Sequence, residues 1–358
     1  MKKILLTGGG SGGHIFPLVA IAEHLKENPD VELRYYGPKD IYSGYLIKLG
    51  ILVKHITPSK FRRYFDWQNF TDLPKFIFSI FQAIFKIYWF MPDVVFSKGG
   101  PGALPVLLAC RFYLIPVIIH ESDSVPGLTN KISGKFAKKI ELAFENAKKY
   151  FPNKNLNVAG NPVRRELFEY LSYDPGISKK RLGIETDKPL IFILGGSLGS
   201  VRINDFIESV VNDLLKKYQI IHQTGTANYQ KLKDKQKPGY KIAAFLESKD
   251  YGEIMAASDL VISRAGAGAI FEIAAFGKPS ILIPLPEAAG DHQRTNAYAY
   301  SQNGAAEVIE EPNLGKVTLG VINKILSDSE KYQQMRKAAL DFAKPEAAKT
   351  VAEDILNI

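Results

Sequence analysis

Three glycine-rich segments each follow a short apolar run, and their composition suits the binding of phosphate. They occupy residues 8–14, 97–102 and 195–199. Glycine permits a tight turn and lets a ligand approach the main chain closely. The backbone N–H groups that open a following helix attract anions. One such turn is as often only a tight connection, but three in one chain predict two phosphate-bearing ligands, or one diphosphate held from both sides.

The first segment also matches the dinucleotide pattern GxGxxG, beginning at Gly8. That class of enzyme requires an acidic residue at the end of the second strand, where it binds the ribose. Here the second apolar run covers residues 31–36 and is followed by a Gly-Pro-Lys sequence, so that the first acidic residue after this run, Asp40, lies beyond the end of the strand. The match to a nicotinamide-dependent enzyme is therefore weak.

Two titratable side chains lie beside turns of this kind. His14 is located where the first turn leads into a helix that we expect to begin by Pro17, and a neutral imidazole can take a proton from a hydroxyl group near neutral pH. A capping or core histidine is the alternative. Glu272 lies about a turn and a half inside a helix that opens with small residues. Its carboxylate can accept two hydrogen bonds from a ribose diol, the alternative being a solvated helix face.

We expect no metal ion and no cofactor. The histidines show no metal-ligand spacing, and the chain has no HExxH motif, no DxD motif and a single cysteine, Cys110. A lone cysteine cannot form an internal disulfide, which favours a reducing compartment. The excess of 46 Lys and Arg over 37 Asp and Glu, a formal charge of +9, suggests an anionic partner. No basic cluster coincides with a nucleic-acid motif, so we expect no nucleic-acid partner.

Short apolar runs alternate with helical patterns through the whole chain, which is typical of parallel α/β units. Helices are predicted at residues 18–27, 73–90 and 104–112 and from near Pro345 onward. Strands are predicted at residues 3–7, 31–36, 52–56, 93–97, 116–120, 139–143, 156–159, 190–194, 219–223, 241–244, 260–263, 280–284 and 306–309. A polar stretch that ends at Lys188 interrupts the alternation, and each half opens with a strand followed by glycines. We therefore predict two Rossmann-like halves with a cleft between them and a boundary near residues 160–164.

The helix expected between residues 73 and 90 is unusually apolar. Its polar residues form one narrow stripe, Lys75, Ser79, Gln82 and Lys86, and the rest is largely aromatic. A surface helix normally buries an apolar arc of roughly 100°, so more than one face of this helix must leave water. Either it is encased in protein, or one flank rests on lipid, where nearby basic residues would favour an anionic surface. The candidate aromatic contacts are Phe78, Phe81, Phe85 and Trp89, and the candidate basic residues are Lys60, Arg62, Arg63, Lys135, Lys138 and Lys139.

Several motifs in order resemble the MurG family, the membrane-associated N-acetylglucosaminyltransferases of peptidoglycan synthesis. The resemblance runs from Lys3 to about Val308. Its motifs are GGSGGHIFP at residues 9–17, HESD at 120–123 with PGLTN at 126–130, GNPVR at 160–164, GGS at 195–197 and the stretch 264–272.

The resemblance implies a GT-B fold, an α/β architecture of two Rossmann-like domains whose parallel sheets face each other across a cleft. Residues 1–160, joined by a C-terminal helix at about 343–358, would form the acceptor and membrane-binding domain. Residues 161–342 would bind the UDP-sugar. The enzyme would transfer N-acetylglucosamine from UDP-N-acetylglucosamine to the C4 hydroxyl of lipid I, giving lipid II with inversion. It would be a peripheral protein on the cytoplasmic side of the cell membrane, in contact with anionic lipids.

The resemblance also assigns site residues. His14 is the candidate catalytic base, and Gly99 and Gly100 are candidate contacts to the acceptor diphosphate. Glu272 would hold the ribose, Arg164 and Ser197 would lie near the donor diphosphate, and Gln293 would contact the sugar. The full set of residues expected to bind the donor is Ser11, Gly12, Gly13, Asp123, Arg164, Ser197, Leu246, Ala267, Gly268, Ala269, Ile270, Phe271, Glu272 and Gln293.

Two departures and three alternatives qualify this assignment. Asp123 stands where many members have an Asn that meets the acetamido group of the sugar, and an acceptor-only carboxylate changes that contact. The stretch 101–104 replaces one that usually contains an aromatic residue. The alternatives are a transferase with another glycolipid acceptor, a UDP-sugar epimerase, and a non-catalytic scaffold on a lipid surface.

Overall fold

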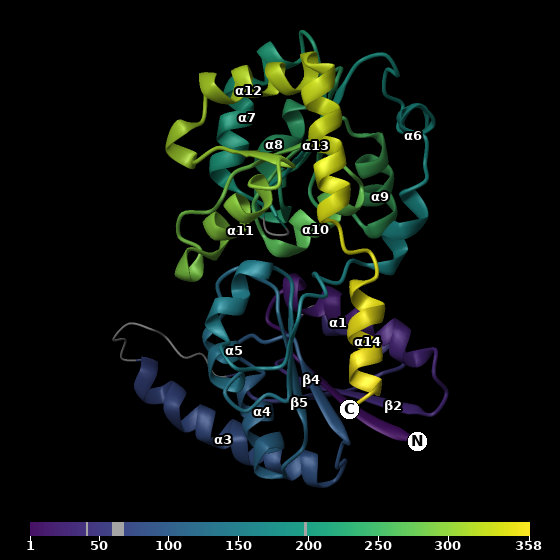
Figure 1. Ribbon diagram of the computed structural model, residues 1–358. Helices are drawn as coiled ribbons and strands as arrows, with labels where there is room; N and C mark the ends of the chain where they lie inside the picture. The colour runs from purple at the N-terminus through teal and green to yellow at the C-terminus, as the bar shows by residue number, and fades with distance from the viewer. Residues whose placement is uncertain (41, 59–67, 197–198) are drawn as a thin grey trace. The chain divides into compact units, whose positions relative to one another are not determined.

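Two parallel sheets organise the chain, one in each of two units. The computed structural model describes residues 1–40, 42–58, 68–196 and 199–358, with the backbone alone for residues 68–71 and 316. Unit 1 consists of Met1–Arg164 and Lys344–Ile358, and unit 2 of Arg165–Ala343. Both units alternate strands with helices along the chain (Figure 1).

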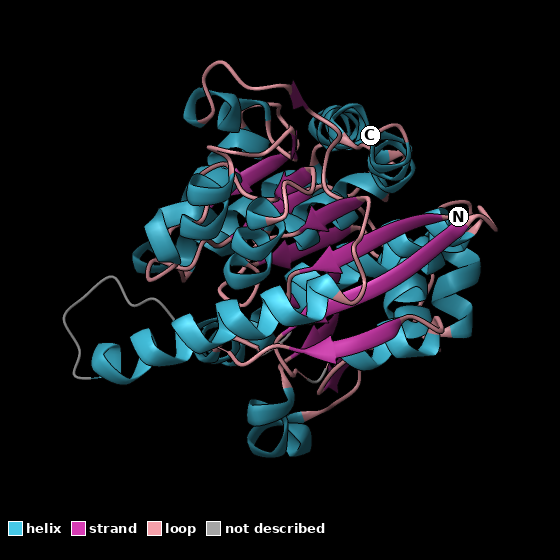
Figure 2. Cartoon of the chain, turned by 90° about the horizontal axis from the view of Figure 1, so that it is seen from below, coloured by secondary structure: helices cyan, strands magenta, loops and turns pink. Residues whose placement is uncertain are grey.

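Unit 1 contains a sheet in the order β3-β2-β1-β4-β5-β6-β7 with every pairing parallel. Helices cover both faces of the strands (Figure 2). The strands are β1 Lys2–Thr7, β2 Val31–Gly37, β3 Leu52–His55, β4 Val94–Ser97, β5 Val117–Glu121, β6 Lys139–Leu142 and β7 Leu156–Asn157. The helices are α1 Gly12–Lys26, α2 Ser43–Lys48, α3 Gln68–Tyr88, α4 Leu104–Phe112, α5 Leu128–Ser133 and α14 Ala347–Leu356, with a 3₁₀ helix at Glu145–Tyr150.

Unit 2 repeats this arrangement with a sheet in the order β10-β9-β8-β11-β12-β13, again parallel throughout. Its strands are β8 Leu190–Leu194, β9 Gln219–Gln223, β10 Tyr240–Ala243, β11 Leu260–Ser263, β12 Ser280–Leu282 and β13 Ala306–Val308. Its helices are α6 Pro175–Arg181, α7 Val201–Leu214, α8 Thr226–Leu232, α9 Ser248–Ala257, α10 Ala267–Ala275, α11 His292–Ser301, α12 Lys316–Ser327 and α13 Ser329–Phe342. Short 3₁₀ helices lie at Arg165–Tyr170, Lys233–Lys235, Ala289–Asp291 and Glu311–Asn313.

The expected strands are all present with small shifts at their ends, and helix α4 has the expected bounds. Two features of the helices differ from the expectation. Helix α1 begins at Gly12 rather than near Pro17, which places His14 in its first turn. The polar stretch before Lys188 is not irregular throughout, because it contains α6, whose Asp174 accepts the backbone N–H of Ile177 as an N-cap.

Each sheet has a switch point, where the chain stops adding strands on one side and continues on the other. In unit 1 it lies between β1 and β4, and in unit 2 between β8 and β11. The loops that leave two such strands diverge, so open α/β sheets bind ligands at this point of their carboxyl edge. All three glycine-rich segments follow strands at these switch points, namely β1, β4 and β8.

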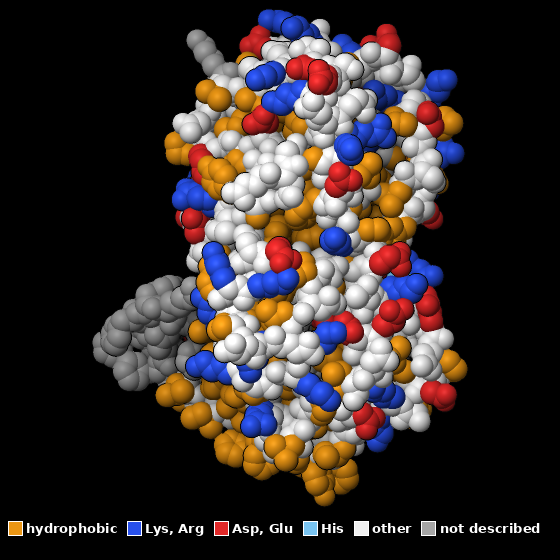
Figure 3. All heavy atoms as spheres, viewed as in Figure 1, with side chains coloured by type: hydrophobic (Ala, Val, Ile, Leu, Met, Phe, Trp, Pro, Cys, Tyr) orange, Lys and Arg blue, Asp and Glu red, His pale blue; other side chains and the backbone are white. Residues whose placement is uncertain are grey.

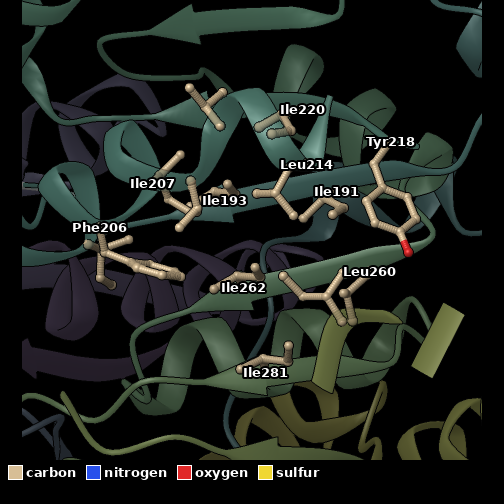
Figure 4. Close-up of a cluster of buried hydrophobic side chains, with 14 of the residues drawn as sticks. Ile191, Ile193, Phe206, Ile207, Leu214, Tyr218, Ile220, Leu260, Ile262 and Ile281 are labelled. Atoms are coloured by element: carbon tan, nitrogen blue, oxygen red, sulfur yellow. The ribbon is translucent and has the colours of Figure 1, made fainter. Parts of the chain in front are cut away.

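The buried core of each unit lies between its sheet and the covering helices. In unit 2 the side chains of β8, β11 and β12 meet those of α7, as in the cluster around Ile191, Ile262 and Phe206 (Figure 4). In unit 1 one face of the sheet packs on α1 and α14, and the other on α3 and α4. Each fully buried aliphatic or aromatic side chain stabilises the fold by about 1.5–3 kcal/mol relative to an exposed one. These clusters therefore hold each sheet firmly against its helices, and with it the loops at the sheet edge.

Helix α14 packs on α1 through residues spaced as one helix face: Ala348, Val351, Ala352 and Ile355. A polar cluster ties the same helix to the sheet. Lys139 Nζ on β6 lies 2.5 Å from Asp354 Oδ1 of α14, and the amide of Asn157 donates to both Glu141 and Asp354. Glu141 is fully buried beside this pair. Burial, followed by the adjacent carboxyl group of Asp354, raises the pKa of Glu141 to about 8.

This cluster predicts a pH dependence of stability. Between about pH 5 and pH 8 the folded chain keeps a proton on Glu141 that the unfolded chain releases, so this group's contribution to stability is lost as the pH rises through that range. The Glu141→Gln variant stays neutral at every pH. As the pH is raised from 5 to 8, the free energy of unfolding of the variant should therefore increase relative to that of the wild type by on the order of 2 kcal/mol.

Urea unfolding at several pH values measures this difference. Glu145→Gln is the matched control, because Glu145 is an exposed carboxylate of the same unit. A Glu141→Gln curve that stays parallel to that of the wild type across the pH range would contradict the assignment.

Candidate functional site

The turn after β1 places His14 at the carboxyl edge of the unit 1 sheet. Ser11 is the N-cap residue of α1, and its hydroxyl lies 2.8 Å from Nδ1 of His14 instead of capping a backbone N–H group. Gly12 and Gly13 form the first residues of the helix, so their backbone N–H groups belong to its positively polarised end. The structure thus brings together the four residues that the sequence analysis assigned to this turn.

The turn after β4 contacts the turn after β1. A Cβ atom on Gly100 would lie 2.8 Å from the carbonyl oxygen of Gly9 and 3.5 Å from Nε2 of His14, and both Gly99 and Gly100 have positive φ. Only glycine therefore fits here. Thr129 Oγ1 donates to the carbonyl of Gly100 and holds the turn from its other side. His14 and the expected acceptor contacts Gly99 and Gly100 are neighbours.

Asp40 stabilises the first turn by hydrogen bonds. It lies beyond the end of β2, where a dinucleotide site has its ribose-binding acidic residue. Its Oδ2 accepts the backbone N–H of Gly10, and its Oδ1 accepts those of Tyr42 and Ser43. The carboxylate is thus bound to main-chain donors of its own unit. This arrangement agrees with the weak match to the nicotinamide-dependent class.

A buried polar group lies directly behind the turn of Gly99 and Gly100. Lys98 is 1% exposed, and its ammonium contacts the side chains of His120, Ser122 and Asn161. Burial lowers the pKa of Lys98 to about 7, while the negative charges of Glu121 and Asp123 act in the opposite direction. Asp123, the expected sugar contact, donates its backbone N–H to Glu121.

Arg164 also reaches the first helix. Its guanidinium group lies over the ring of Phe16 on α1, 5.2 Å from the ring centroid. Cation–π contacts of this kind contribute about 0.5–1 kcal/mol at exposed sites. The structure therefore places Arg164 in unit 1, near the turn that carries His14.

In unit 2 the expected donor residues gather at the N-terminus of α10. The helix begins at Ala267, directly after β11 and a short turn. A Cβ atom on Gly266 or Gly268 would meet no atom within 4 Å, so the space in front of this helix end is open. Glu272 lies one and a half turns further along, partly exposed. An anion at this end would face the backbone N–H groups of the first turn.

A buried arginine holds the loops around α10 in place. Arg264 donates to the carbonyl oxygens of Ile283 and Pro284, to Ser200 Oγ, and to the carboxylate of Glu311. Ser200 in turn is the N-cap of α7, the helix that follows the third glycine-rich turn. Ser197 of that turn lies outside the described residues.

Glycine is also required at the end of this third turn. A Cβ atom on Gly199 would lie 1.9 Å from the carbonyl oxygen of Thr224, and the residue has a φ of +79°. The turn therefore packs directly against the loop that follows β9.

Two further expected donor contacts are held by hydrogen bonds within unit 2. The backbone N–H of Leu246 donates to Gln223, so a contact of Leu246 with a base has to use its carbonyl oxygen. The side-chain oxygen of Gln293 accepts the backbone N–H of Leu285, which leaves the amide NH₂ group as the part that can meet a sugar hydroxyl.

Helix α3 presents Ser79, Gln82 and Lys86 of its polar stripe to the protein and most of its aromatic residues to solvent, while Lys75 of the stripe is exposed. The stripe satisfies backbone groups at the end of the edge strand β3: Ser79 donates to the carbonyl of Thr57, Gln82 accepts the N–H of Thr57, and Lys86 donates to the carbonyl of His55. The interpretation of α3 as a fully buried helix is therefore wrong.

The exposed flank is strongly apolar. Phe78, Phe81, Phe85 and Trp89 are 59%, 66%, 65% and 67% exposed. Hydrophobic side chains gather over this end of unit 1 (Figure 3).

Of the basic residues expected near this aromatic flank, some are exposed, one lies on the opposite face of the sheet and three fall outside the described residues. Lys139 is on the other face of the sheet, because it pairs with Asp354 of α14 while the adjacent Ile140 packs toward α3 and α4. Its expected place near α3 is therefore wrong. Lys135 and Lys138 are exposed. Lys60, Arg62 and Arg63 lie outside the described residues. In the part of the chain that is described, no helix has the length and apolar character that crossing a membrane requires.

The sequence analysis did not select Lys98, Arg264 or Asp40 as site residues. Lys98 and Arg264 share a signal that was available: each is the first residue after a buried strand at a switch point, in the sequences Ser-Lys-Gly-Gly and Ser-Arg-Ala-Gly. A cation at such a position is either a ligand contact or an internal support for the loops. Among residues 1–40, 42–58, 68–196 and 199–358, no group of three or more His, Cys, Asp or Glu side chains is placed to hold a metal ion.

The fold is of the GT-B class, and comparison with known proteins identifies the chain as a glycosyltransferase. Residues 4–141 match the model of the glycosyltransferase family 28 N-terminal domain, and residues 190–351 that of the family 28 C-terminal domain. A relative from Clostridium tetani is 41% identical over 92% of both chains. Its name is UDP-N-acetylglucosamine–N-acetylmuramyl-(pentapeptide) pyrophosphoryl-undecaprenol N-acetylglucosamine transferase. The chain belongs to this family, the MurG transferases.

Solved structures agree with this placement. The crystal structure of MurG from Acinetobacter baumannii has a TM-score of 0.79 and 26% sequence identity, with all of both chains covered. A crystal structure of UDP-N-acetylglucosamine 2-epimerase has a TM-score of 0.69 at 16% identity, covering 100% of this chain and 96% of that one. The likeness to the epimerase is one of fold alone.

Proposed function

We propose that the chain transfers N-acetylglucosamine from UDP-N-acetylglucosamine to the C4 hydroxyl of the N-acetylmuramyl group of lipid I, forming lipid II. The observation that carries the proposal is the position of His14 in a chain of this family. Its imidazole lies between the hydroxyl of Ser11 and the turn of Gly99 and Gly100. Of the three alternatives, a scaffold does not need this arrangement, and an epimerase has no acceptor to activate.

Unit 2 supplies the donor site. The open N-terminus of α10 offers backbone N–H groups to the diphosphate of UDP. The glycine-rich segment at residues 195–199 is expected from the sequence to contribute as well. Glu272 accepts hydrogen bonds from the ribose hydroxyls, and the NH₂ group of Gln293 reaches the sugar. Arg264 does not contact the donor in this account, because its donors are bound to Ser200, Glu311 and two backbone carbonyls.

Unit 1 supplies the acceptor site and the base. When Nδ1 of His14 carries the proton and donates it to Ser11 Oγ, Nε2 keeps its lone pair and faces the turn of Gly100. Nε2 takes the proton of the acceptor C4 hydroxyl while the oxygen of this hydroxyl forms the new bond to the anomeric carbon of the donor sugar. The bond from that carbon to the phosphate oxygen breaks on the opposite side, so the configuration inverts and UDP leaves. Main-chain N–H groups and Arg164 stabilise the negative charge that develops on UDP.

The activity is tested with radiolabelled UDP-N-acetylglucosamine and a lipid I analogue, with butanol-extractable label as the product. Removal of a general base costs about 10²–10⁴-fold in rate, so His14→Ala should lower kcat by this amount and leave the affinity for UDP unchanged. His24→Ala is the matched control, because His24 lies on the same helix and pairs only with Glu27 among the described contacts.

Three results would contradict the proposal. The first is a wild-type chain that releases or isomerises the sugar without labelling the lipid, as an epimerase would. The second is label on a different glycolipid in preference to lipid I. The third is a His14→Ala variant with the kcat of the wild type.

We further propose that the aromatic flank of α3 docks the enzyme on an anionic membrane surface from the cytoplasmic side. Three aromatic side chains on one flank of α3, with Trp89 directly after the helix, form an apolar surface that a monomeric protein seldom leaves in water. Aromatic residues with basic neighbours suit the interface of a bilayer. The exposed Lys135 and Lys138, together with the net charge of +9, favour anionic lipids.

The triple variant Phe81→Ser, Phe85→Ser, Trp89→Ser tests the docking surface. With about 1 kcal/mol lost for each partly inserted ring, binding to phosphatidylglycerol-containing vesicles should weaken about 100-fold in a sedimentation assay. The control variant replaces three exposed apolar residues of unit 2, Val201, Val317 and Leu340, by Ser. Equal vesicle binding by the triple variant and the wild type would show that another surface docks the protein.

A further inference from the structure

Lys98 occupies an unusual environment for a charged side chain. It is 1% exposed, and its Nζ lies 2.6 Å from His120 Nδ1, 2.5 Å from Ser122 Oγ and 2.8 Å from Asn161 Oδ1. An ammonium group has three N–H donors and no acceptor. All three donors therefore have a side-chain acceptor, and these acceptors come from two segments that are separate in the sequence.

The hydrogen bonds around His120 identify Lys98 as the cation of this group. His120 Nε2 lies 2.9 Å from the carbonyl oxygen of Gly160, which can only accept, so Nε2 carries the proton. Nδ1 then has a lone pair and accepts from Lys98. Burial, followed by the charge of Lys98, lowers the pKa of His120 well below its usual value, which keeps the imidazole neutral.

The carboxyl group of Glu121, whose charge raises the pKa of Lys98, is held nearby by other donors. Burial, followed by the charge of Asp123, raises the pKa of Glu121 to about 7. Glu121 is 3% exposed, and its carboxylate accepts the backbone N–H groups of Asp123 and Gly127 and the amide of Asn130. The carboxylate thereby fixes the segment from residue 121 to residue 130. Lys98 and Glu121 together hold this segment from two sides.

The same segment supports the turn that contacts His14. Thr129 donates to the carbonyl of Gly100, and a Cβ atom on Gly99 would lie 2.9 Å from the side-chain oxygen of Asn130. Lys98 is the residue directly before this turn, and its own backbone N–H donates to Thr7 at the end of β1. A shift of Lys98 would therefore move the turn of Gly99 and Gly100 relative to His14.

Unit 2 contains a counterpart at the equivalent position. Arg264 is the first residue after β11, as Lys98 is the first after β4, and β11 and β4 occupy the same place in the two sheet orders. Arg264 is 7% exposed and also binds groups from several loops. In both units a buried cation thus joins the loops at the switch point.

We infer that Lys98 is a positioning residue for the acceptor side of the transfer reaction. Its three hydrogen bonds fix the turn of Gly99 and Gly100 against His14, beside the place where the acceptor's diphosphate is expected. The inference rests on the proposed function. It assigns to Lys98 no contact with either substrate.

The variant Lys98→Met tests the inference, because it keeps an unbranched side chain of similar length and removes the three donors. Displacement of reacting groups by about 1 Å costs about 100-fold in rate. We therefore expect kcat/KM for a short-chain lipid I analogue to fall about 100-fold. The calorimetric affinity for UDP, whose diphosphate and ribose contacts we propose in unit 2, should stay within about twofold of the wild type.

Lys278→Met is the matched control. Lys278 is also buried, but it donates only to the backbone carbonyls of Ala256 and Ser258 at the end of α9. This variant should lose thermal stability and keep the kcat/KM for the acceptor and the affinity for UDP. A second variant, Ser122→Ala, removes one acceptor and leaves the ammonium in place. It should lower the same kcat/KM by a smaller factor, about threefold to tenfold, as the loss of one hydrogen bond implies, and it serves if Lys98→Met does not fold.

The outcomes separate this inference from the proposed function. A wild-type chain that forms no lipid product overturns the proposed function and the inference with it. A wild-type chain that is active, beside a folded Lys98→Met variant whose kcat/KM for the acceptor is unchanged, overturns the inference alone. The same holds if the calorimetric affinity for UDP falls in parallel with kcat/KM for the acceptor, or if Ser122→Ala has no effect where Lys98→Met fails to fold.

Discussion

The position of every candidate binding turn in this chain depends on where the parallel strands of the two sheets end. At the carboxyl edge of each sheet, the two loops that leave the strands at the switch point diverge and leave room for a ligand between them. Glycine turns and helix N-termini then present main-chain N–H groups that attract phosphate. In this chain both sheets repeat the same strand order, and each carries such turns at its switch point. This repeated arrangement gives each unit a site for a phosphate-bearing ligand, as the proposed division between a donor on unit 2 and an acceptor on unit 1 requires.

Loops that bind a ligand through their main chain need contacts within the protein that fix their conformation before the ligand binds. In both units a buried cation serves this purpose. Lys98 joins the loops of unit 1 through side chains, and Arg264 joins those of unit 2 through a carboxylate, a hydroxyl and two carbonyl groups. A buried charge is costly unless its hydrogen bonds are satisfied. The many partners of each cation therefore resist any displacement of the loops that it joins.

The sequence predicted the strands well, because buried parallel strands are short, apolar and bounded by turn residues. It predicted the start of α1 too late, because glycines have low helix propensity and the pattern therefore favoured Pro17. It missed α6, although Asp174 and Pro175 are a typical helix start, because that helix is short and polar. The partners of Lys98 lie 22 to 63 residues away, and no local pattern indicates such contacts. The polar stripe of α3 was visible, but its hydrogen-bond partners at His55 and Thr57 lie 22 to 31 residues away, so no local pattern indicated that the stripe faces the protein.

The central claim is that main-chain donors at the switch point of unit 2 bind the diphosphate of the donor. Hydrogen–deuterium exchange of the full chain with and without UDP tests it most directly. The account predicts that UDP slows exchange in residues 264–272, at the start of α10, and leaves the strands of unit 1 unchanged. Slowed exchange that is confined to unit 1, for example to residues 8–14, would contradict it.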